Sequence, residues 1–157
     1  MRAKDIMTRH VITVPETGTV RDVVSALLNH GISAVPVIDT SGKLVGIVSE
    51  GDLMHPRRRR SWWLALFIDA DELALEFVKE HSRPVSDIMT RNVVTAEPET
   101  TLVDIAKLLE KNAIERVPIV DKGKLVGIVS RANLVRALTM VPKDSEVRDR
   151  MLSRLRS

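Results

Sequence analysis

The stretch Gly42-Lys43-Leu44-Val45-Gly46-Ile47-Val48-Ser49 occurs twice in this chain, and its second copy, residues 123–130, is identical. Asp5-Ile6-Met7-Thr8-Arg9 likewise recurs without a change at residues 87–91. Val35-Pro36-Val37-Ile38-Asp39 recurs as Val-Pro-Ile-Val-Asp at residues 117–121, with Val and Ile exchanged at the third and fourth positions. Three segments that recur in one order indicate an internal duplication, and one turn residue is missing from its second copy.

Each copy predicts the same succession of elements. Apolar residues recur at helical spacing over residues 20–29 and 102–111, which predicts an amphipathic helix in each copy. The two apolar runs that follow are almost unbroken Val, Ile and Leu, so we expect two strands that are buried on both faces. In chain order the expected elements are a short helix ending at Thr8 or Thr90, a strand at 11–14 or 93–96, the amphipathic helix, strands at 34–38 and 44–48 or at 117–120 and 125–129, and a last helix from Ser49 or Ser130.

The predicted fold class is therefore α/β (α+β), with two β-α-β-β-α repeats. Neither repeat alone could bury both faces of so small a sheet, so we expect the repeats to pack through their sheets with pseudo-two-fold symmetry. The expected organisation is repeat 1 at residues 1–54, a helical insert at 55–84, repeat 2 at 85–141 and a C-terminal helix at 142–157.

Composition and charge limit the classes of protein that fit this chain. Of its 157 residues, 44% are hydrophobic and 29% are charged, which is typical of a folded domain with a solvated surface. There is no cysteine, which excludes disulfides and thiolate metal sites, and no apolar run is long enough to span a membrane. We expect a cytoplasmic protein without a signal peptide. The net charge is +3, and Arg57–Arg60 alone contribute more than this, so the basic character is local and argues against nucleic acid as a partner.

Next to the arginine run, the insert contains every aromatic residue of the chain: Trp62, Trp63, Phe67 and Phe77. A helix capped by Asp69 or Asp71 is expected to end near Glu80. Three interpretations remain open: a helical linker whose aromatics dock on the repeats or on a second subunit, a contact with a partner or a membrane surface, and nucleic-acid binding through arginine and stacking. The first is favoured, because a run of four charges is a weak signal.

The tail, residues 143–157, predicts one more helix. Val147, Met151 and Leu155 recur at a spacing of four, with arginines between them. This segment is either the first helix of a further domain that has been cut off or a terminal docking helix.

The sequence lacks the patterns of a catalytic centre. It has no phosphate-binding loop, no nucleophile elbow and no pair of carboxylates in a cleft-forming motif. The histidines show no metal-ligand spacing: His10, His30, His55 and His81. We therefore expect no enzyme activity, no metal site and no required cofactor.

The repeats resemble the cystathionine-β-synthase (CBS) domain, and the pair resembles a Bateman module. The motifs that carry the resemblance are Asp-Ile-Met-Thr at each start, Gly-Ile-Val-Ser before each last helix, and the segments Ile32-Ser33-Ala34-Val35-Pro36 and Ile114-Glu115-Arg116-Val117-Pro118. The Arg-Arg-Ser-Trp-Trp insert is similar to that of bacterial CBS pairs that are followed by a BON domain, and the tail resembles the opening of such a domain, in which case the chain is truncated.

The resemblance implies a regulatory module that binds adenosine-containing nucleotides (AMP, ADP, ATP or related) in a cleft between the repeats. It also implies a homodimer that signals to an attached domain or a protein partner. In the main cleft a carboxylate would accept both ribose hydroxyls, an arginine fork would clamp phosphate, and the helix after Ser49 would offer free N–H groups to phosphate. The residues carried over to this cleft are Ile47, Ser49, Asp52, Val94, Thr95, Glu115, Arg116 and Pro118.

Ser49-x-x-Asp52 has a second interpretation, because it is also a variant capping box that would exist in a module without a ligand. The alternative function is accordingly a ligand-free interaction or dimerisation module.

The second cleft departs from the family pattern. Asn133 stands where an aspartate is expected, and a neutral amide accepts two hydroxyls less well than a carboxylate. Ser33-Ala34 stands in place of the Glu115-Arg116 pair, so this cleft has no arginine. We expect it to be weak, empty, or selective for a ligand with less phosphate. The residues carried over to it are Thr13, Ser33, Ala34, Pro36, Ile128, Ser130 and Asn133.

Overall fold

The computed structural model describes residues 1–54, 82–140, 150 and 153. The aromatic cluster of the insert and the helix expected from Asp69 or Asp71 lie outside these residues. Of the predicted C-terminal helix, two residues are described: both have helical backbone, and the Ser153 hydroxyl donates a hydrogen bond of 3.0 Å to the Arg150 carbonyl. No helix in the described part of the chain is long and apolar enough to cross a membrane.

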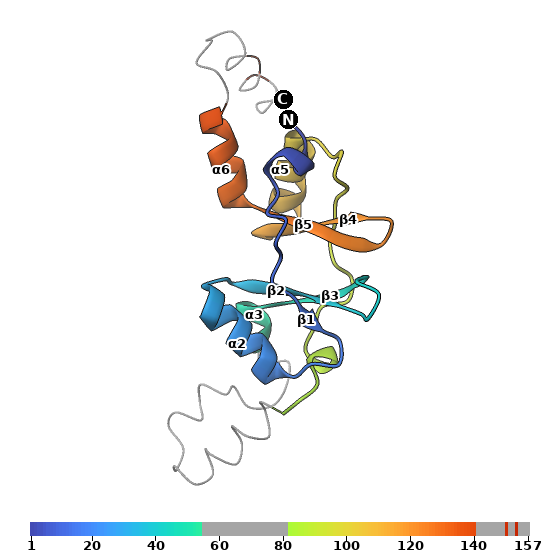
Figure 1. Ribbon diagram of the computed structural model, residues 1–157. Helices are drawn as coiled ribbons and strands as arrows, with labels where there is room; N and C mark the ends of the chain where they lie inside the picture. The colour runs from blue at the N-terminus through green and yellow to red at the C-terminus, as the bar shows by residue number, and fades with distance from the viewer. Residues whose placement is uncertain (55–81, 141–149, 151–152, 154–157) are drawn as a thin grey trace. The chain divides into compact units, whose positions relative to one another are not determined.

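Internal contacts divide the chain into two compact units. The first-repeat unit holds residues 12–93, and the second-repeat unit holds residues 1–11 together with 94–157. The start of each repeat therefore belongs to the unit of the other repeat. Helix α1 (Ala3–Ile6), which opens the chain, packs against β5 (Lys124–Ser130) and α6 (Arg131–Met140) of the second repeat (Figure 1).

The first-repeat unit is a three-stranded sheet covered by helices. Its strands lie in the order β1-β2-β3, with β1 parallel to β2 and β2 antiparallel to β3. Its elements are β1 (Val14–Pro15), α2 (Val20–His30), β2 (Ala34–Ile38), β3 (Leu44–Ser49), α3 (Glu50–Met54) and the 3-10 turn η2 (Val85–Asp87). Its core consists of Val14, Val23, Leu27, Val35, Val37, Val48, Val85 and Met89.

Helix α2 shows why the sequence folds this way locally. The Thr19 hydroxyl accepts a hydrogen bond from the Asp22 N–H, and the Asp22 carboxylate accepts one from the Thr19 N–H, which closes a capping box. Gly31 ends the helix in the left-handed conformation, at φ 59°. Val23 and Leu27, one turn apart, face the sheet and are buried.

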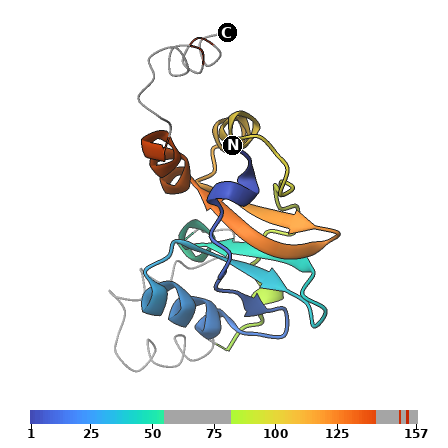
Figure 2. The same cartoon turned by 45° about the horizontal axis from the view of Figure 1, so that its top comes forward.

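The second-repeat unit repeats this plan with a two-stranded sheet (Figure 2). Strand β4 (Arg116–Asp121) pairs antiparallel with β5, and Ala96 forms a single parallel bridge to Ile119. Helix α5 (Leu102–Lys111) begins after Thr101, whose hydroxyl accepts from the Asp104 N–H. The core of this unit consists of Ala3, Ala96, Ile105, Leu109, Val117, Ile119 and Val129.

The predicted amphipathic helices and hairpin strands are confirmed to within one residue at each end. The short strands predicted at 11–14 and 93–96 are wrong in extent: β1 begins at Val14, and its counterpart is the single bridge at Ala96. The physical reason is position, because residues 11–12 and 93–94 are where the chain passes between units and a strand needs a neighbour to pair with. The opening helices also end earlier than predicted, α1 at Ile6 and η2 at Asp87.

The start of each repeat, residues 2–8 and 84–90, is called here its leading segment. In the first-repeat unit the backbones of Thr90 and Ile47 exchange hydrogen bonds of 2.9 and 3.0 Å. Met89 covers Gly46, where an added Cβ would lie 2.6 Å from the methionine sulfur. Only glycine therefore leaves room for the methionine at this point of β3.

The second-repeat unit anchors the other leading segment in the same way. Thr8 and Ile128 exchange backbone hydrogen bonds of 2.9 and 3.0 Å. Met7 covers Gly127, where an added Cβ would lie 2.8 Å from the methionine Cγ. The Asp-Ile-Met-Thr motif and the glycine of Gly-Ile-Val-Ser are thus contact partners within each unit.

Candidate functional site

The Ser49-x-x-Asp52 motif lies where β3 ends and α3 begins. Asp52 Oδ2 accepts hydrogen bonds from the Ser49 N–H at 2.8 Å and from the Ser49 hydroxyl at 3.0 Å, while Ser49 Oγ accepts one from the Asp52 N–H at 3.4 Å. The capping interpretation is therefore confirmed. Asp52 is half-buried, and its other oxygen, Oδ1, accepts no hydrogen bond from the residues that the structure describes.

The same cap occurs at the start of α6. Asn133 Oδ1 accepts from the Ser130 N–H at 2.8 Å and from the Ser130 hydroxyl at 2.7 Å, and Ser130 Oγ accepts from the Asn133 N–H at 3.3 Å. In addition, Asn133 Nδ2 donates a hydrogen bond of 3.1 Å to the Ile6 carbonyl. Sequence reasoning did not find this Ile6 contact, which depends on the leading segment being in this unit.

The backbone N–H groups around the start of α3 are already engaged. The Glu50 N–H donates to the Ser33 carbonyl at 2.9 Å, and the Ser49 and Asp52 N–H groups form the cap. Two of the N–H groups that the helix after Ser49 was expected to offer to phosphate, those of Glu50 and Asp52, are therefore engaged by the chain itself. The rest of the expectation stays a prediction.

The β2–β3 hairpin brings predicted residues of both clefts to one of its ends. Ala34 pairs with Ser49, and Pro36 pairs with Ile47. Ala34 and Pro36 are buried, whereas Ser33 and Ile47 are half-buried. Thr13, also assigned to the second cleft, is half-buried and directly precedes β1.

The β4–β5 hairpin does the same in the second-repeat unit. Arg116 pairs with Ser130, and Pro118 pairs with Ile128. Arg116 is half-buried, while the neighbouring Glu115 is exposed and its carbonyl accepts from the Arg131 N–H at 3.0 Å. Val94 and Thr95 directly precede the bridge at Ala96. Val94 is half-buried and Thr95 is exposed.

Each predicted cleft thus draws residues from both units. The structure groups Ile47, Ser49 and Asp52 in the first-repeat unit, and Glu115, Arg116 and Pro118 in the second-repeat unit. The grouping of Asp52 with Arg116 in one cleft stays a prediction.

One carboxylate with a lowered pKa lies at the other end of the first hairpin. Hydrogen bonds from the Ser41 hydroxyl and from the Lys43 N–H lower the pKa of Asp39. Because Asp39 holds the β2–β3 turn, this effect concerns the turn and not the end of the hairpin that carries Ser49.

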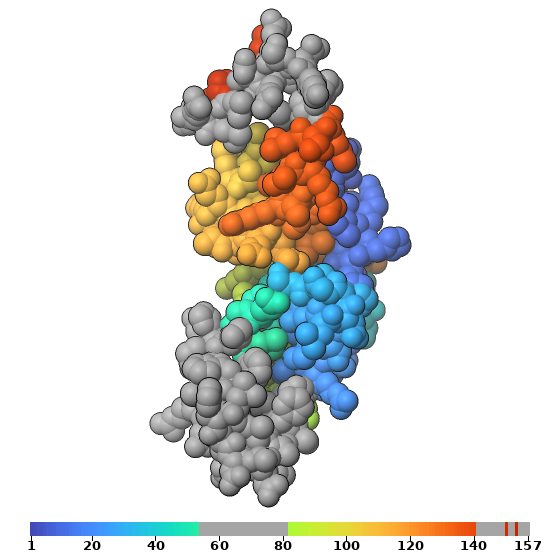
Figure 3. All heavy atoms as spheres, turned by 90° about the vertical axis from the view of Figure 1, so that its left-hand side faces the viewer, coloured from blue at the N-terminus to red at the C-terminus, as the bar shows by residue number. Residues whose placement is uncertain are grey.

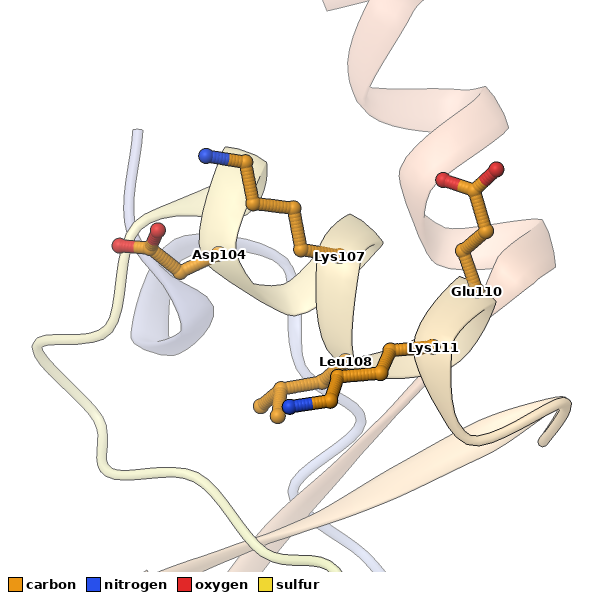
Figure 4. A pocket seen from close by; sticks show the side chains of 5 residues that line it. All are labelled: Asp104, Lys107, Leu108, Glu110 and Lys111. Carbon is orange, nitrogen blue, oxygen red and sulfur yellow. The ribbon is translucent and has the colours of Figure 1, made fainter.

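A shallow hollow on α5 does not involve the predicted residues. Its lining side chains all come from that one helix, with Leu108 as the apolar member among charged neighbours (Figure 4). The remaining lining residues are Asp104, Lys107, Glu110 and Lys111. In the described part of the chain, no cluster of His, Asp or Glu could hold a metal ion.

Comparison with known proteins identifies the repeats. The family model of the CBS domain matches residues 3–57 and 85–140. The chain belongs to the CBS-domain family. The described fold, with two small α/β units, agrees with the CBS-pair structures that it resembles.

Two relatives are informative about this CBS pair. The uncharacterised protein MJ1426 of Methanocaldococcus jannaschii is 38% identical over 154 residues, which cover 88% of this chain and 91% of that protein. The chloroplastic CBSX2 of Arabidopsis thaliana is 33% identical over 155 residues, 90% of this chain and 65% of that protein.

Two solved structures of CBS pairs contain adenosine compounds. CBSX2 in complex with AMP aligns with a TM-score of 0.69 at 34% identity, over 88% of this chain and 96% of that chain. The CBS pair of MJ0100, in complex with 5′-methylthioadenosine and S-adenosyl-L-methionine, aligns with a TM-score of 0.66 at 27% identity, over 88% and 96%. Two CBS pairs similar to this one therefore bind small molecules that contain adenosine.

Proposed function

We propose that this CBS pair is a regulatory module that binds an adenosine-containing nucleotide, with the Asp52 carboxylate as the contact to the ribose. The observation that carries the proposal is the state of that side chain. Oδ2 is held by the Ser49 cap, and Oδ1 accepts no hydrogen bond from the described residues. A carboxylate that is fixed through one oxygen presents the other to ligand hydroxyls without a loss of rotamer freedom on binding.

Arg116 is proposed as the contact to phosphate. It is the first residue of β4, and a strand holds the base of its side chain in place. A guanidinium binds phosphate oxygens with two parallel hydrogen bonds. Two N–H groups in the first turn of α3, those of Glu50 and Asp52, already donate to other groups of the chain and are not available to phosphate. The proposed phosphate contact therefore depends more strongly on Arg116.

The proposed regulation follows from the division into units. Asp52 belongs to the first-repeat unit and Arg116 to the second, so a nucleotide that binds both residues favours one arrangement of the units over others. Ligand occupancy would then bias an attached domain or a protein partner, with a coupling free energy of about 1–3 kcal/mol in typical systems.

The Asp52→Asn variant tests the ribose contact. Its amide oxygen can still accept from Ser49, as Asn133 does from Ser130, so the cap survives and the charge is lost. We expect at least about a tenfold loss of affinity for AMP, ADP and ATP alike in calorimetric titrations, because a hydrogen bond to a charged group contributes about 1.5–3 kcal/mol.

Asp22→Asn is the matched control, because Thr19 and Asp22 form the same cap on α2 outside the predicted clefts. It should leave affinity unchanged. If Asp52→Asn binds like the unaltered protein, Asp52 is not the ribose contact. If none of the three nucleotides raises the melting temperature of the unaltered protein, the nucleotide proposal itself fails.

The Arg116→Ala variant tests the phosphate contact. It should weaken ATP and ADP binding more than adenosine binding, since adenosine has no phosphate. Arg131→Ala, an exposed arginine at the start of α6, serves as the control for general charge. An equal loss for all three ligands would show that Arg116 does not touch phosphate.

An interaction role is the second candidate, and α6 favours it. Val135 and Leu138, one turn apart, are 63% and 68% exposed. Figure 3 shows α6, in orange, on the surface of the second-repeat unit. Adjacent exposed apolar side chains are typical of contact surfaces. We propose that the partner is a second copy of the chain or an attached domain. If a homodimer forms through α6, Leu138→Glu should lower the mass measured by light scattering. Leu28→Glu on α2 is the control.

A further inference from the structure

Asn133 is engaged through both of its side-chain polar atoms. Its oxygen caps α6, and its nitrogen donates to the carbonyl of Ile6, which lies 127 residues away in sequence. Ile6 is the last residue of α1, and the carbonyl groups at a helix end have no partner inside the helix. The amide of Asn133 therefore satisfies a group that the short helix cannot satisfy by itself.

Asp52 holds the same position in the first-repeat unit but cannot make this bond. The caps of Asp52 and Asn133 have nearly the same geometry, with N–H to side-chain oxygen distances of 2.8 Å in both. An ionised carboxylate, however, has no donor. Ile88 is the residue of the first-repeat unit that corresponds to Ile6. Its carbonyl therefore cannot accept a hydrogen bond from Asp52 in the way that the Ile6 carbonyl accepts one from Asn133.

We infer that Asn133 is a clip that fixes the leading segment of the second-repeat unit, and that it is not a ligand contact. The residue type at this position then decides the role of the side chain. An asparagine amide holds the leading segment, whereas an aspartate carboxylate is available to a ligand. The ligand half of this inference rests on the proposed function, whereas the clip rests on the hydrogen bond from Asn133 to Ile6.

Other contacts of the same segment agree with a specific anchor here. Arg2 Nη1 donates to the Glu99 carbonyl at 2.8 Å, and Arg2 and Lys4 both pair with the Glu99 carboxylate. The corresponding positions in the first-repeat unit carry no charge: they are Thr17, Pro84 and Ser86. Because the ion pairs are about half exposed, each contributes little, so the variants below address the half-buried Asn133 bond.

The Asn133→Asp variant isolates the clip. It reproduces the cap that Asp52 forms with Ser49, removes the donor and places a carboxylate against the Ile6 carbonyl. The readout is amide hydrogen exchange at Thr8, whose N–H donates to Ile128 across the leading segment. We expect exchange about tenfold faster than in the unaltered protein, as the loss of one partly buried hydrogen bond predicts.

Asp52→Asn is the reciprocal control, because it adds a donor in the other unit. Exchange at Thr90, whose N–H donates to Ile47, should stay the same or become slower. Unchanged exchange at Thr8 in Asn133→Asp would overturn the clip.

A measurement on the unaltered protein covers the case in which Asn133→Asp does not fold. The side-chain NH₂ protons of Asn133 should exchange about tenfold more slowly than those of Asn29, an exposed residue at the end of α2. Equal rates for the two side chains would contradict the inference.

A nucleotide titration separates the clip from a ligand contact. Asn133→Ser removes both the amide donor to Ile6 and the oxygen that caps α6, and it should leave AMP affinity and stoichiometry unchanged while exchange at Thr8 accelerates. A fall in AMP affinity without a change in exchange would overturn the inference. If the unaltered protein binds no nucleotide, the proposed function fails and the exchange measurements alone decide whether the clip exists.

Discussion

The two units carry the same octapeptide hairpin and differ in the residues around it. Both close a capping box at the end of the hairpin, but Asp52 keeps an oxygen available while Asn133 donates to Ile6. The comparison teaches that duplication has kept the residues that build the scaffold. The residues that decide what each scaffold does have diverged.

The two methionines of the leading segments, Met7 and Met89, also differ between the units in how deeply they are buried. Met89 is buried in the core of the first-repeat unit, whereas Met7 is half-buried in the other. Both cover a glycine that leaves no room for a Cβ. The same contact should therefore tolerate change differently in the two units.

The largest effect is expected from Gly46→Ala. The new Cβ would lie 2.6 Å from the Met89 sulfur and 2.9 Å from its Cγ, and a buried side chain has little space to move. We expect a loss of about 2–3 kcal/mol in the free energy of unfolding, at the upper end for overpacking. Gly127→Ala should cost less, about 1–2 kcal/mol, because the half-buried Met7 can rotate toward solvent.

Urea unfolding of both variants measures the difference, and Gly46→Ala combined with Met89→Ala identifies its cause. The double variant should lose less stability than the sum of its two single changes, because the shorter side chain removes the clash. Additive losses would show that the methionine is not what restricts this glycine.

The sequence predicts the local features of this fold better than its long-range contacts. The helix from Leu102 and the hairpin strands are predicted well, because apolar periodicity and capping residues act over a few positions. The exchange of leading segments is not predicted by periodicity. One signal could have revealed it: Gly46, in the middle of an apolar strand, indicates that another part of the chain comes close.

The candidate site divides in the same way. The cap between Ser49 and Asp52 was one of two interpretations of a local motif, and the structure confirms it. The amide contact of Asn133 could not be predicted, because Ile6 is its partner only through the exchange of leading segments. Whether Asp52 and Arg116 act together remains a prediction, since it depends on the two units jointly.

The hairpin turns offer a second way to sharpen the comparison. In the second-repeat unit Lys122 adopts φ 49° and Gly123 φ 82°, so a residue with a Cβ occupies the left-handed region. Lys122→Asn should raise the free energy of unfolding by about 0.5–1 kcal/mol, because Asn-Gly suits two successive positive φ angles. Thr40→Asn, in the turn of the other hairpin, should have no such effect, and an equal gain from both would refute the strain argument.

The smallest effect concerns the pH dependence of the first hairpin turn, whose backbone is held by hydrogen bonds to the Asp39 carboxylate. The Asp39 carboxylate accepts from the Ser41 N–H at 2.8 Å, the Ser41 hydroxyl at 2.7 Å and the Lys43 N–H at 2.9 Å. These bonds lower its pKa, with the Ser41 hydroxyl as the largest cause. A carboxyl whose pKa is lower in the folded state stabilises the fold above its unfolded pKa, and this stabilisation disappears as the pH falls through the folded value. Asp39→Asn should therefore be slightly less stable than the unaltered protein at pH 7, and the difference should shrink as the pH falls below about 4. Denaturation midpoints measured across this pH range test the effect, and Asp121→Asn in the other turn is the control. A stability difference that stays constant with pH would show that the Asp39 charge does not hold the turn.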